Sequence, residues 1–418
     1  MTSEVCLMNR LGIVLAADSA TTVKYWNGDV EEVRYFKGAN KIFQLSNEHP
    51  VGVMIYNAVD VLRVPWEVVI KEFRKELGSK SFNSVKGYAD EFISFLNNDT
   101  RMFPASVRRQ EFEDSIRRAA LRIHVLAKDA IKEGSVADFA IFLERLTAAG
   151  KLADPSEFGH SAEEIAALRQ GFGEVIQKHL DDWASVFGHA LHSLDEAELQ
   201  FVLVAALREV TSSGNWTGLV FSGFGDHSIY PECVHMQECQ FVANKLIFRG
   251  IVEDKTSYDV PAVISGFAQT SMIDTLRIGF SDDVMEPLYE DTKRTYADLV
   301  DQVADMLGQS VPDDKKSEMT NAAVQSIIDR MFDRAFKNHS LPLRRVVGVL
   351  PLDEMSALAE TLINLQSLKE KVTRPTETVG GPVDVAVITR AEGLVWVKRK
   401  HYFDGNLNSR FFERRRRD

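Results

Sequence analysis

The chain places strand patterns in three separated regions and long helical patterns in the intervals between them. Residues 1 to about 60 hold the apolar runs GIVLAAD, KIFQLS and VGVMIY, bounded by polar stretches that contain glycine or proline. Strand patterns return at WTGLVFSGFG and ANKLIFRGIVED, and again at VDVAVITR and GLVWVKRK. Helical spacing dominates 104–210 and 270–340. No low-complexity linker separates the blocks, so we predict an α+β fold whose single core carries helical insertions.

This pattern divides the chain into five parts. Residues 1–103 form the N-terminal part of the core, 104–213 a helical insertion and 214–268 the central strands. Residues 269–343 form a second helical insertion, and 344–418 supply a long helix, two closing strands and a basic tail. The tail holds Arg414 to Arg417 and is either a solvated terminus or a docking segment for a polyanion.

Two helical stretches give specific expectations. PWEVVIKEFRKELG starts at Pro65 and ends at Gly78, which is a natural C-cap. SIRRAALRIHVLAKDAI repeats apolar residues at helical spacing, at Ile116, Ala119, Ala120, Ile123 and Leu126 or Ala127. That apolar face either covers the core of its own chain or enlarges an interface between subunits.

The N-terminus reads as a β-hairpin. Val5 to Met8 is the first strand, Gly12 to Ala17 is the second, and the turn is centred near Arg10. Residues whose numbers sum to about 20 then face each other, which places Thr2 beside Asp18. The first residues of the chain are therefore expected on an ordered strand, where most chains fray.

Composition excludes several classes of protein. A net charge of −12 disfavours a general nucleic-acid binder. No apolar run approaches the length of a membrane span, and the N-terminus lacks the basic region and cleavage pattern of a secretory signal. The three cysteines are too few for a disulfide framework, so we expect a reducing, cytoplasmic environment.

Three residues combine into a chemical site: Thr2, Asp18 and Lys41. A threonine hydroxyl needs a nearby base, and after loss of Met1 the α-amine of Thr2, with a pKa of about 7.7–8.0, supplies one. A lysine close by favours the neutral amine through like-charge repulsion, and an aspartate holds that lysine in place. Each residue also has a simpler interpretation: a terminal threonine, an aspartate that caps Ala20 or Thr21, and a solvated lysine.

The order of these residues resembles the N-terminal region of proteasome β-subunits and their bacterial relatives. GIVLAADSATT is followed by NKIFQLS and PVGVMIY, as in that family. LDEMSALAETLINLQSL resembles the last long helix of the family, GGPVDVAVITRAEGLVWV its closing Gly-Gly and strand pair, and LVFSGFGDHSIYP its central Gly-x-Gly strand. The resemblance covers about half the chain in collinear pieces, and the blocks near 104–210 and 270–340 have no counterpart.

The resemblance implies a four-layer αββα N-terminal-nucleophile hydrolase sandwich with large helical insertions. Thr2 would be the nucleophile once Met1 is removed, with Asp18 and Lys41 as its supporting pair and with no metal or organic cofactor. The interval between Asp18 and Lys41 is longer than usual, and YWNGDVEEVRYF is expected to form an extra hairpin or lip.

The sequence departs from the family at several positions. Tyr56 and Asn57 stand where two glycines usually build the oxyanion hole, although a backbone N–H is the group that donates there. Thr376 and Val379 replace an accessory aspartate and serine before the closing glycines. Near the central Gly-x-Gly, the serine is Ser222, and Phe224 stands between the glycines.

Other candidate sites are weaker. Cys233, His235 and Cys239 occupy odd positions of one expected strand, which permits metal ligation, but no second ligand pair has standard spacing. SGFGD lacks the lysine and hydroxyl residue of a phosphate loop. His189 and His192 lie in a helical run, where packed or solvated histidines are the usual case.

Two functions fit these observations. The first is a proteasome-like threonine peptidase or amidohydrolase that acts on peptides or proteins and assembles into a homo-oligomeric ring or helical stack; the sequence leaves open whether an ATP-dependent unfoldase is its partner. The second is a non-catalytic scaffold or assembly protein whose helical insertions bind partners. The altered accessory positions favour the scaffold, whereas the presence of Thr2, Asp18 and Lys41 favours the enzyme.

Overall fold

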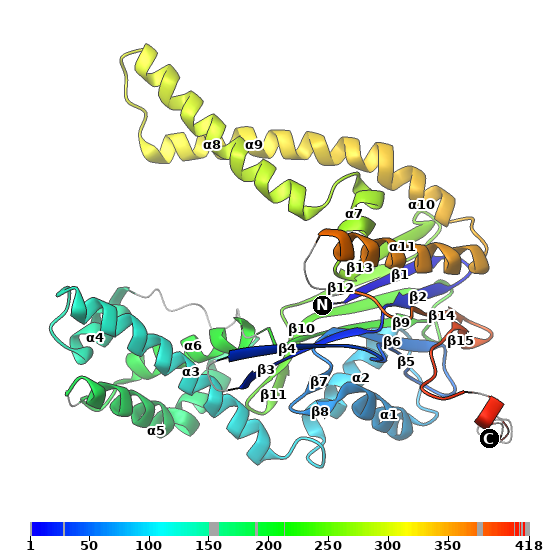
Figure 1. Cartoon of the computed structure of the whole chain (residues 1–418), viewed down its shortest axis with the longest axis horizontal. Helices are drawn as coiled ribbons and strands as arrows, with labels where there is room; N and C mark the ends of the chain where they lie inside the picture. The colour runs from blue at the N-terminus through cyan, green and yellow to red at the C-terminus, as the bar shows by residue number, and fades with distance from the viewer. Residues whose placement is uncertain are drawn as a thin grey trace.

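The computed structural model describes residues 2–27, 30–149, 159–188, 191–212, 214–373, 379–404, 406–408, 410 and 413 (Figure 1). Three of the residues considered above, Met1, His189 and Thr376, lie outside these ranges, as does the basic tail from Arg414 to Arg417.

The N-terminal strand is an interior strand of a five-stranded antiparallel sheet. Its strand order is β13 (Ala262–Ala268), β1 (Ser3–Asn9), β2 (Ile13–Ala17), β14 (Asp384–Thr389) and β15 (Gly393–Lys398). Every residue from 3 to 9 is buried, because β1 pairs on both edges and packs on both faces. The ordered N-terminus expected from the sequence is therefore confirmed.

A second antiparallel sheet lies against the first. Its order is β11 (Lys245–Ile247), β10 (Glu232–Val242), β9 (Thr217–Gly223), β6 (Val51–Asn57) and β5 (Ile42–Gln44), and β12 (Gly250–Lys255) also pairs with β10. The two sheets share one apolar cluster, which includes Cys6, Met8 and Leu15 from the first and Met54 and Val220 from the second.

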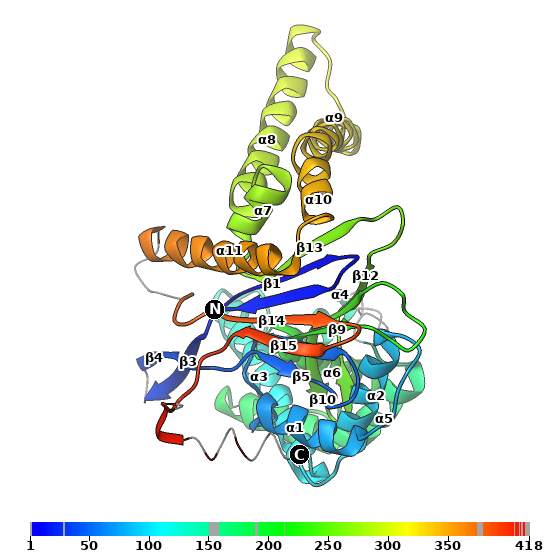
Figure 2. The same ribbon diagram turned by 90° about the vertical axis from the view of Figure 1, so that its right-hand side faces the viewer.

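Helices cover the outer faces of both sheets (Figures 1 and 2). The helix α11 (Leu352–Thr373) packs on the first sheet, where Met355 and Leu362 meet Val5 and Leu7. The second sheet is covered by α1 (Trp66–Leu77) and α2 (Val85–Asn98). Both sheets are thus apolar on both faces, which explains the continuous rather than alternating apolar runs. The α+β class predicted from the sequence is confirmed.

Four helices form a bundle, and along the sequence they lie between β6 and β9 of the second sheet. They are α3 (Ala105–Lys132), α4 (Phe139–Ala149), α5 (Ala162–Val186) and α6 (Glu196–Ser212). The apolar face of α3 is covered by this bundle, with Ile116, Ala119, Ala120, Ile123 and Ala127 buried in its core. Leu126 is 49% exposed. The face considered for a subunit interface is therefore closed within its own chain.

A second helical block extends away from the sheets as an arm (Figures 1 and 2). It contains α7 (Ser271–Ile278), α8 (Asp282–Met306), α9 (Asp313–Ala335), a π-helical turn (Phe336–Ser340) and α10 (Leu341–Val347). Of α8 and α9, few residues are buried, among them Ala304 and Val324. No helix in the described part of the chain is both long and apolar enough to cross a bilayer.

Shorter elements complete the fold. β3 (Ala20–Asn27) and β4 (Val30–Lys37) pair as an antiparallel hairpin in the long interval between Asp18 and Lys41, as the sequence predicts. β7 (Asp60–Val61) and β8 (Val64–Pro65) pair before α1, and a 3₁₀ turn spans Asn406–Asn408. α1 ends at Gly78, whose φ of 52° belongs to the left-handed region that glycine enters freely.

Candidate active site

Asp18 is the hub of a buried hydrogen-bond network at the end of β2. Its Oδ1 accepts the backbone N–H of Ser3 at 3.0 Å, and its Oδ2 accepts those of Gly380 at 2.8 Å and Ala20 at 3.2 Å. The carboxylate is 1% exposed. Asp18 thus caps Ala20, as the simpler interpretation holds, but it also ties β1 to the loop before β14.

Thr2 and Lys41 join this network through their side chains. The Thr2 hydroxyl donates to Asp18 Oδ1 at 2.5 Å, and Lys41 Nζ lies 2.6 Å from the same oxygen. Lys41 Nζ also hydrogen-bonds Thr2 Oγ1. Both side chains are 4% exposed, so the interpretation of Lys41 as a solvated lysine is wrong. The structure brings together the three residues that the sequence singles out.

The main chain around Thr2 is fixed by a neighbouring strand. Gln269, which follows β13, donates its N–H to the carbonyl oxygen of Thr2 at 2.9 Å and accepts the Ser3 hydroxyl at 2.9 Å. On the lysine side, the carbonyl of Lys41 accepts the N–H of Ile55 at 3.0 Å. Two sheets therefore hold the hydroxyl and the ammonium group in one orientation.

The hairpin register differs by one residue from the prediction. Glu4 pairs with Ala17 and Met8 with Ile13, so facing residues sum to 21 rather than 20. The turn runs from Asn9 to Gly12, and the backbone N–H of Asn9 donates a hydrogen bond to the carbonyl oxygen of Gly12 at 3.1 Å. Asp18 therefore sits opposite Ser3, and its Oδ1 reaches Thr2 diagonally.

Glu4 is a member of this region that the sequence interpretation missed. It lies two residues after Thr2 on β1 and is 0% exposed. Neither of its carboxyl oxygens has a hydrogen-bond partner among the described residues. Burial raises the pKa of Glu4 well above its usual value, the charge of Lys41 opposes this, and Asp18 adds to it. The signal in the sequence was a lone glutamate inside an apolar strand.

Tyr56 and Asn57 lie at the end of β6. The Tyr56 hydroxyl is 2.8 Å from His235 Nε2, and burial, with Glu4 as a smaller contribution, raises the pKa of the phenol. The Asn57 amide donates to the carbonyl oxygens of Gly214 and Trp216, both at 2.7 Å. Within the described ranges, neither side chain hydrogen-bonds Thr2, Asp18 or Lys41.

The Tyr56 ring fills space between the two sheets. It packs on Trp216, His235 and Phe267, with ring centroids 5.7–6.0 Å apart. A Cβ at Gly218 would lie 1.9 Å from this ring, so a glycine is required there. Desolvation lowers the pKa of His235 to about 4, which keeps the imidazole neutral at ordinary pH.

The other residues that depart from the family pattern contribute to packing and to hydrogen bonds of the fold. Ser222 is buried against Cys6, with Oγ and Sγ 3.8 Å apart, and Phe224 belongs to the apolar cluster between the sheets. Val379 is buried, and its carbonyl oxygen accepts the hydroxyl of Ser367 at 3.2 Å. Of the two closing glycines, Gly380 belongs to the site, because its N–H donates a hydrogen bond to Asp18 Oδ2.

The expectation that Cys233, His235 and Cys239 share one face of a strand is wrong. The pairing of β10 with β9 shifts between Met236 and Cys239, where Glu238 has a φ of 52°. Cys233 packs between the sheets, whereas Cys239 belongs to the cluster beneath α1 and α2. An inserted residue reverses the alternation of side chains. No group of three metal-ligating residues occurs in the part of the chain that the structure describes.

The remaining candidates also serve the fold. His192 Nε2 lies 3.0 Å from the Glu198 carboxylate. In SGFGD, a Cβ at Gly223 would lie 2.2 Å from the Pro50 carbonyl oxygen, and one at Gly225 would lie 2.3 Å from that of Asn83. Both glycines therefore allow close backbone packing.

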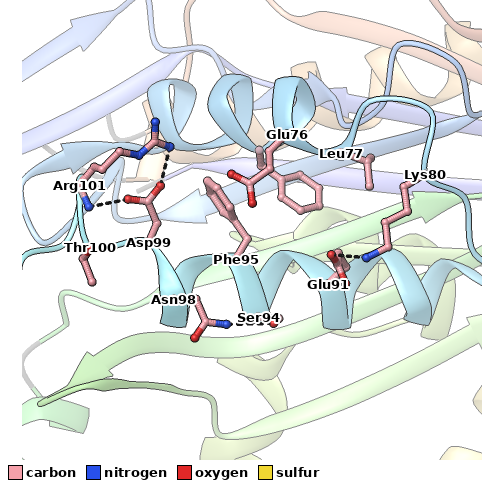
Figure 3. Close-up of a pocket in the computed structure, with 11 residues that line it drawn as sticks. Glu76, Leu77, Lys80, Glu91, Ser94, Phe95, Asn98, Asp99, Thr100 and Arg101 are labelled. Atoms are coloured by element: carbon pink, nitrogen blue, oxygen red, sulfur yellow. Dashed lines mark hydrogen bonds and ion pairs between the residues drawn. The ribbon is translucent and has the colours of Figure 1, made fainter.

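A pocket of about 640 Å³ lies between α1 and α2, on the outer side of the second sheet (Figure 3). Four of its charged side chains form ion pairs, Asp99 with Arg101 at 2.9 Å and Lys80 with Glu91 at 2.6 Å. None of the residues of the Thr2 network lines it. The pocket is therefore separate from the candidate active site.

Comparison with known proteins gives limited information. No protein-family model matches the chain, and no curated protein matches it. Among solved structures, a mutant Anbu from Hyphomicrobium sp. strain MC1 aligns over 100% of this chain and 96% of its own, with 10% identity and a TM-score of 0.28. Anbu from Yersinia bercovieri, described as an ancestral beta-subunit, aligns over 98% and 93%, with 11% identity and a TM-score of 0.27. Similarity at this level assigns neither a fold nor an activity.

Proposed function

We propose that the chain is a proteasome-like threonine peptidase or amidohydrolase in which Thr2 becomes the N-terminal nucleophile. The observation that carries this proposal is the buried contact of one hydroxyl with both Asp18 and Lys41. The order helix, sheet, sheet, helix supports the finer assignment to the four-layer αββα N-terminal-nucleophile fold.

The geometry suits covalent catalysis. After Met1 is removed, the α-amine of Thr2 takes the proton from Oγ1 as this oxygen bonds to the amide carbon of the substrate. The amine then passes the proton to the departing nitrogen, which leaves an ester on Thr2. Water, deprotonated by the same amine, attacks the ester, releases the acid and returns a proton to Oγ1. Lys41 favours the neutral amine by repulsion, and Asp18 holds Lys41 in place. Backbone N–H groups at Tyr56 and Asn57 are proposed as the oxyanion donors.

A threonine-directed β-lactone tests this mechanism. We expect a covalent adduct on the peptide that begins with Thr2, from a chain that lacks Met1, together with hydrolysis of peptide substrates. Thr2→Ala should abolish both while leaving the fold intact, and Thr2→Ser should retain part of the activity. Thr389→Ala is the matched control, since Thr389 ends β14 at the opposite end of the same sheet. Wild-type rates in Thr2→Ala would refute the proposal.

The second candidate, a non-catalytic scaffold, is favoured by Val379, an apolar residue at the position of the family's accessory serine. Large apolar side chains exposed on α8 and α9 also favour it, including Leu299, Val303, Met306 and Met319. The β-lactone experiment separates the two functions. A chain that retains Met1 and forms no adduct would be the scaffold.

Further proposals concern substrate, assembly and organisation. We propose peptides or proteins as substrates, a cytoplasmic location and an ATP-dependent unfoldase as a partner. We also propose a homo-oligomeric ring or helical stack that encloses Thr2. The exposed apolar side chains of the α8–α9 arm support assembly, and the buried face of α3 does not contribute to it. The division at residues 103, 213, 268 and 343 into a core and two insertions also stays a proposal.

A further inference from the structure

Glu4 is a fully buried acid whose carboxyl group has no hydrogen-bond partner among the described residues. It pairs along the backbone with Ala17 on one side and Phe267 on the other, and both residues belong to the apolar cluster between the sheets. Directly opposite residues of antiparallel strands share a face, so the Glu4 carboxyl points into this inter-sheet space. Because neither oxygen has a partner among the described residues, the carboxyl does not serve as a structural anchor.

Three titratable groups interact electrostatically with Glu4, and a fourth, His235, contacts one of them. Asp18 follows β2 and Lys41 precedes β5, and both act on Glu4 electrostatically. Tyr56 on β6 lies close enough for an ionised Glu4 to raise the pKa of its phenol, and its hydroxyl is 2.8 Å from Nε2 of His235 on β10. The imidazole of His235 is neutral at ordinary pH. The charged members of this set are thus the Asp18–Lys41 pair alone.

We propose that Glu4 is a positioning residue that acts on Thr2 through Lys41, and that it does so by remaining a neutral carboxylic acid. In this state the site holds one carboxylate, on Asp18, and one ammonium group, on Lys41, so its net charge is zero. Ionisation of Glu4 releases its proton to solvent and leaves a second carboxylate, so the net charge becomes −1.

The second negative charge would oppose the catalytic arrangement. It offsets the positive field of Lys41, which otherwise favours the neutral α-amine of Thr2, and the amine then holds its proton and no longer acts as a base. Glu4 thereby sets the upper pH limit of the site. This inference rests on the proposed function for its effect on rate, but the neutral state of Glu4 is testable without any activity.

Glu4→Gln is the decisive variant, because the amide copies the shape of the neutral acid and cannot ionise. In the wild type, kcat/KM should fall about tenfold per pH unit above the pH at which Glu4 ionises, and Glu4→Gln should lack this fall while matching the wild type at lower pH. Glu370→Gln is the matched control. Glu370 is a buried acid on α11 that contacts Gln366 at 3.1 Å, and this variant should keep the fall.

A second measurement separates this inference from the proposed function. Between the usual carboxyl pKa and the pH at which native Glu4 ionises, urea unfolding of the wild type should become about tenfold more favourable per pH unit, relative to Glu4→Gln, because the native state keeps a proton that the unfolded state loses. Glu4→Met provides the same comparison if Glu4→Gln does not fold. If the two chains differ in the pH dependence of unfolding but the wild type hydrolyses no substrate, the proposed function is rejected and the neutral state of Glu4 is retained. Parallel pH dependences of unfolding, or superimposable pH–rate profiles in an active enzyme, would overturn the role of Glu4.

Discussion

Removing the Asp18 carboxylate should destabilise the chain far more than removing its lysine partner. Asp18→Ala leaves the Lys41 ammonium group buried at 4% exposure without its carboxylate. It also leaves the N–H groups of Ser3, Ala20 and Gly380 without their acceptor. Lys41→Met, in contrast, leaves a carboxylate that still accepts those three N–H groups and the Thr2 hydroxyl.

The magnitudes follow from this asymmetry. Breaking a buried pair by removing one partner costs about 3–5 kcal/mol. We expect Asp18→Ala near the upper end, at about 4–5 kcal/mol, since three backbone donors also lose their acceptor. Lys41→Met should cost about 1–2 kcal/mol, because hydrogen bonds to a carboxylate stabilise the charge that remains. For a domain whose total stability is about 5–15 kcal/mol, the first change brings the chain close to unfolding.

Urea denaturation of both single variants and of the double variant measures this effect. Adding Lys41→Met to Asp18→Ala removes the stranded charge, so the double variant should be more stable than Asp18→Ala alone. Asp18→Asn, which retains the shape of the side chain, provides a folded comparison. A loss below about 1 kcal/mol in Asp18→Ala, a larger loss in Lys41→Met, or simple additivity in the double variant would refute the reasoning.

Three further outcomes are expected. Lys41→Met should lower the hydrolysis rate by orders of magnitude at neutral pH, as removal of one member of a nucleophile–base unit does, and an unchanged rate would count against its role. The pKa of His235 is lowered from 6.5 to about 4. As the pH falls from 6.5 to about 4, the imidazole is therefore protonated in the unfolded state and stays neutral in the native state. Stability should therefore fall by up to about 1.4 kcal/mol per pH unit relative to His235→Gln, and identical pH dependences would exclude this. Light scattering should give a mass well above the 47.0 kDa of one chain, whereas a fully active monomer at micromolar concentration would reject the proposed assembly.

The sequence was sufficient to predict the main strands and helices, because these depend on local pattern. Apolar runs bounded by turn residues placed β1, β2, β6 and β14, and the glycine at position 78 marked the end of α1. Thr2, Asp18 and Lys41 were singled out by their complementary chemistry together with the resemblance of their order to that of proteasome β-subunits. Their contact through Asp18 Oδ1 is a tertiary fact that the spacing only approximated.

The register of the hairpin depended on distant residues. Asn9 closes the turn by accepting the N–H of Leu11 at 2.9 Å, and its amide donates to the carbonyls of Val347 and Leu350 at 3.1 and 2.9 Å. These contacts, more than three hundred residues away, favour a turn from Asn9 to Gly12. Local turn statistics contain no information about them, and the sequence could therefore predict the register only to within one residue.

The misplaced cysteine and the missed glutamate have a related cause. Alternation assigns faces correctly only while a strand has no inserted residue, and the irregularity before Cys239 cannot be seen in its residue types. Glu4 was passed over because a single charged residue in an apolar strand usually faces solvent. Here the second sheet covers that face, so burial is decided by packing rather than by the strand itself.

The position of Thr2 also constrains how the site can be completed. β1 is hydrogen-bonded on both edges, Gln269 holds the Thr2 carbonyl, and the Thr2 hydroxyl already bonds Asp18 and Lys41. With the side chain and the carbonyl engaged, the α-nitrogen is the one remaining group of Thr2 that can accept a proton from Oγ1. An α-nitrogen joined to another residue is an amide and has no basicity to offer. Under the proposed mechanism, removal of Met1 would therefore be the step that converts a structural contact between three buried side chains into a nucleophile with its own base.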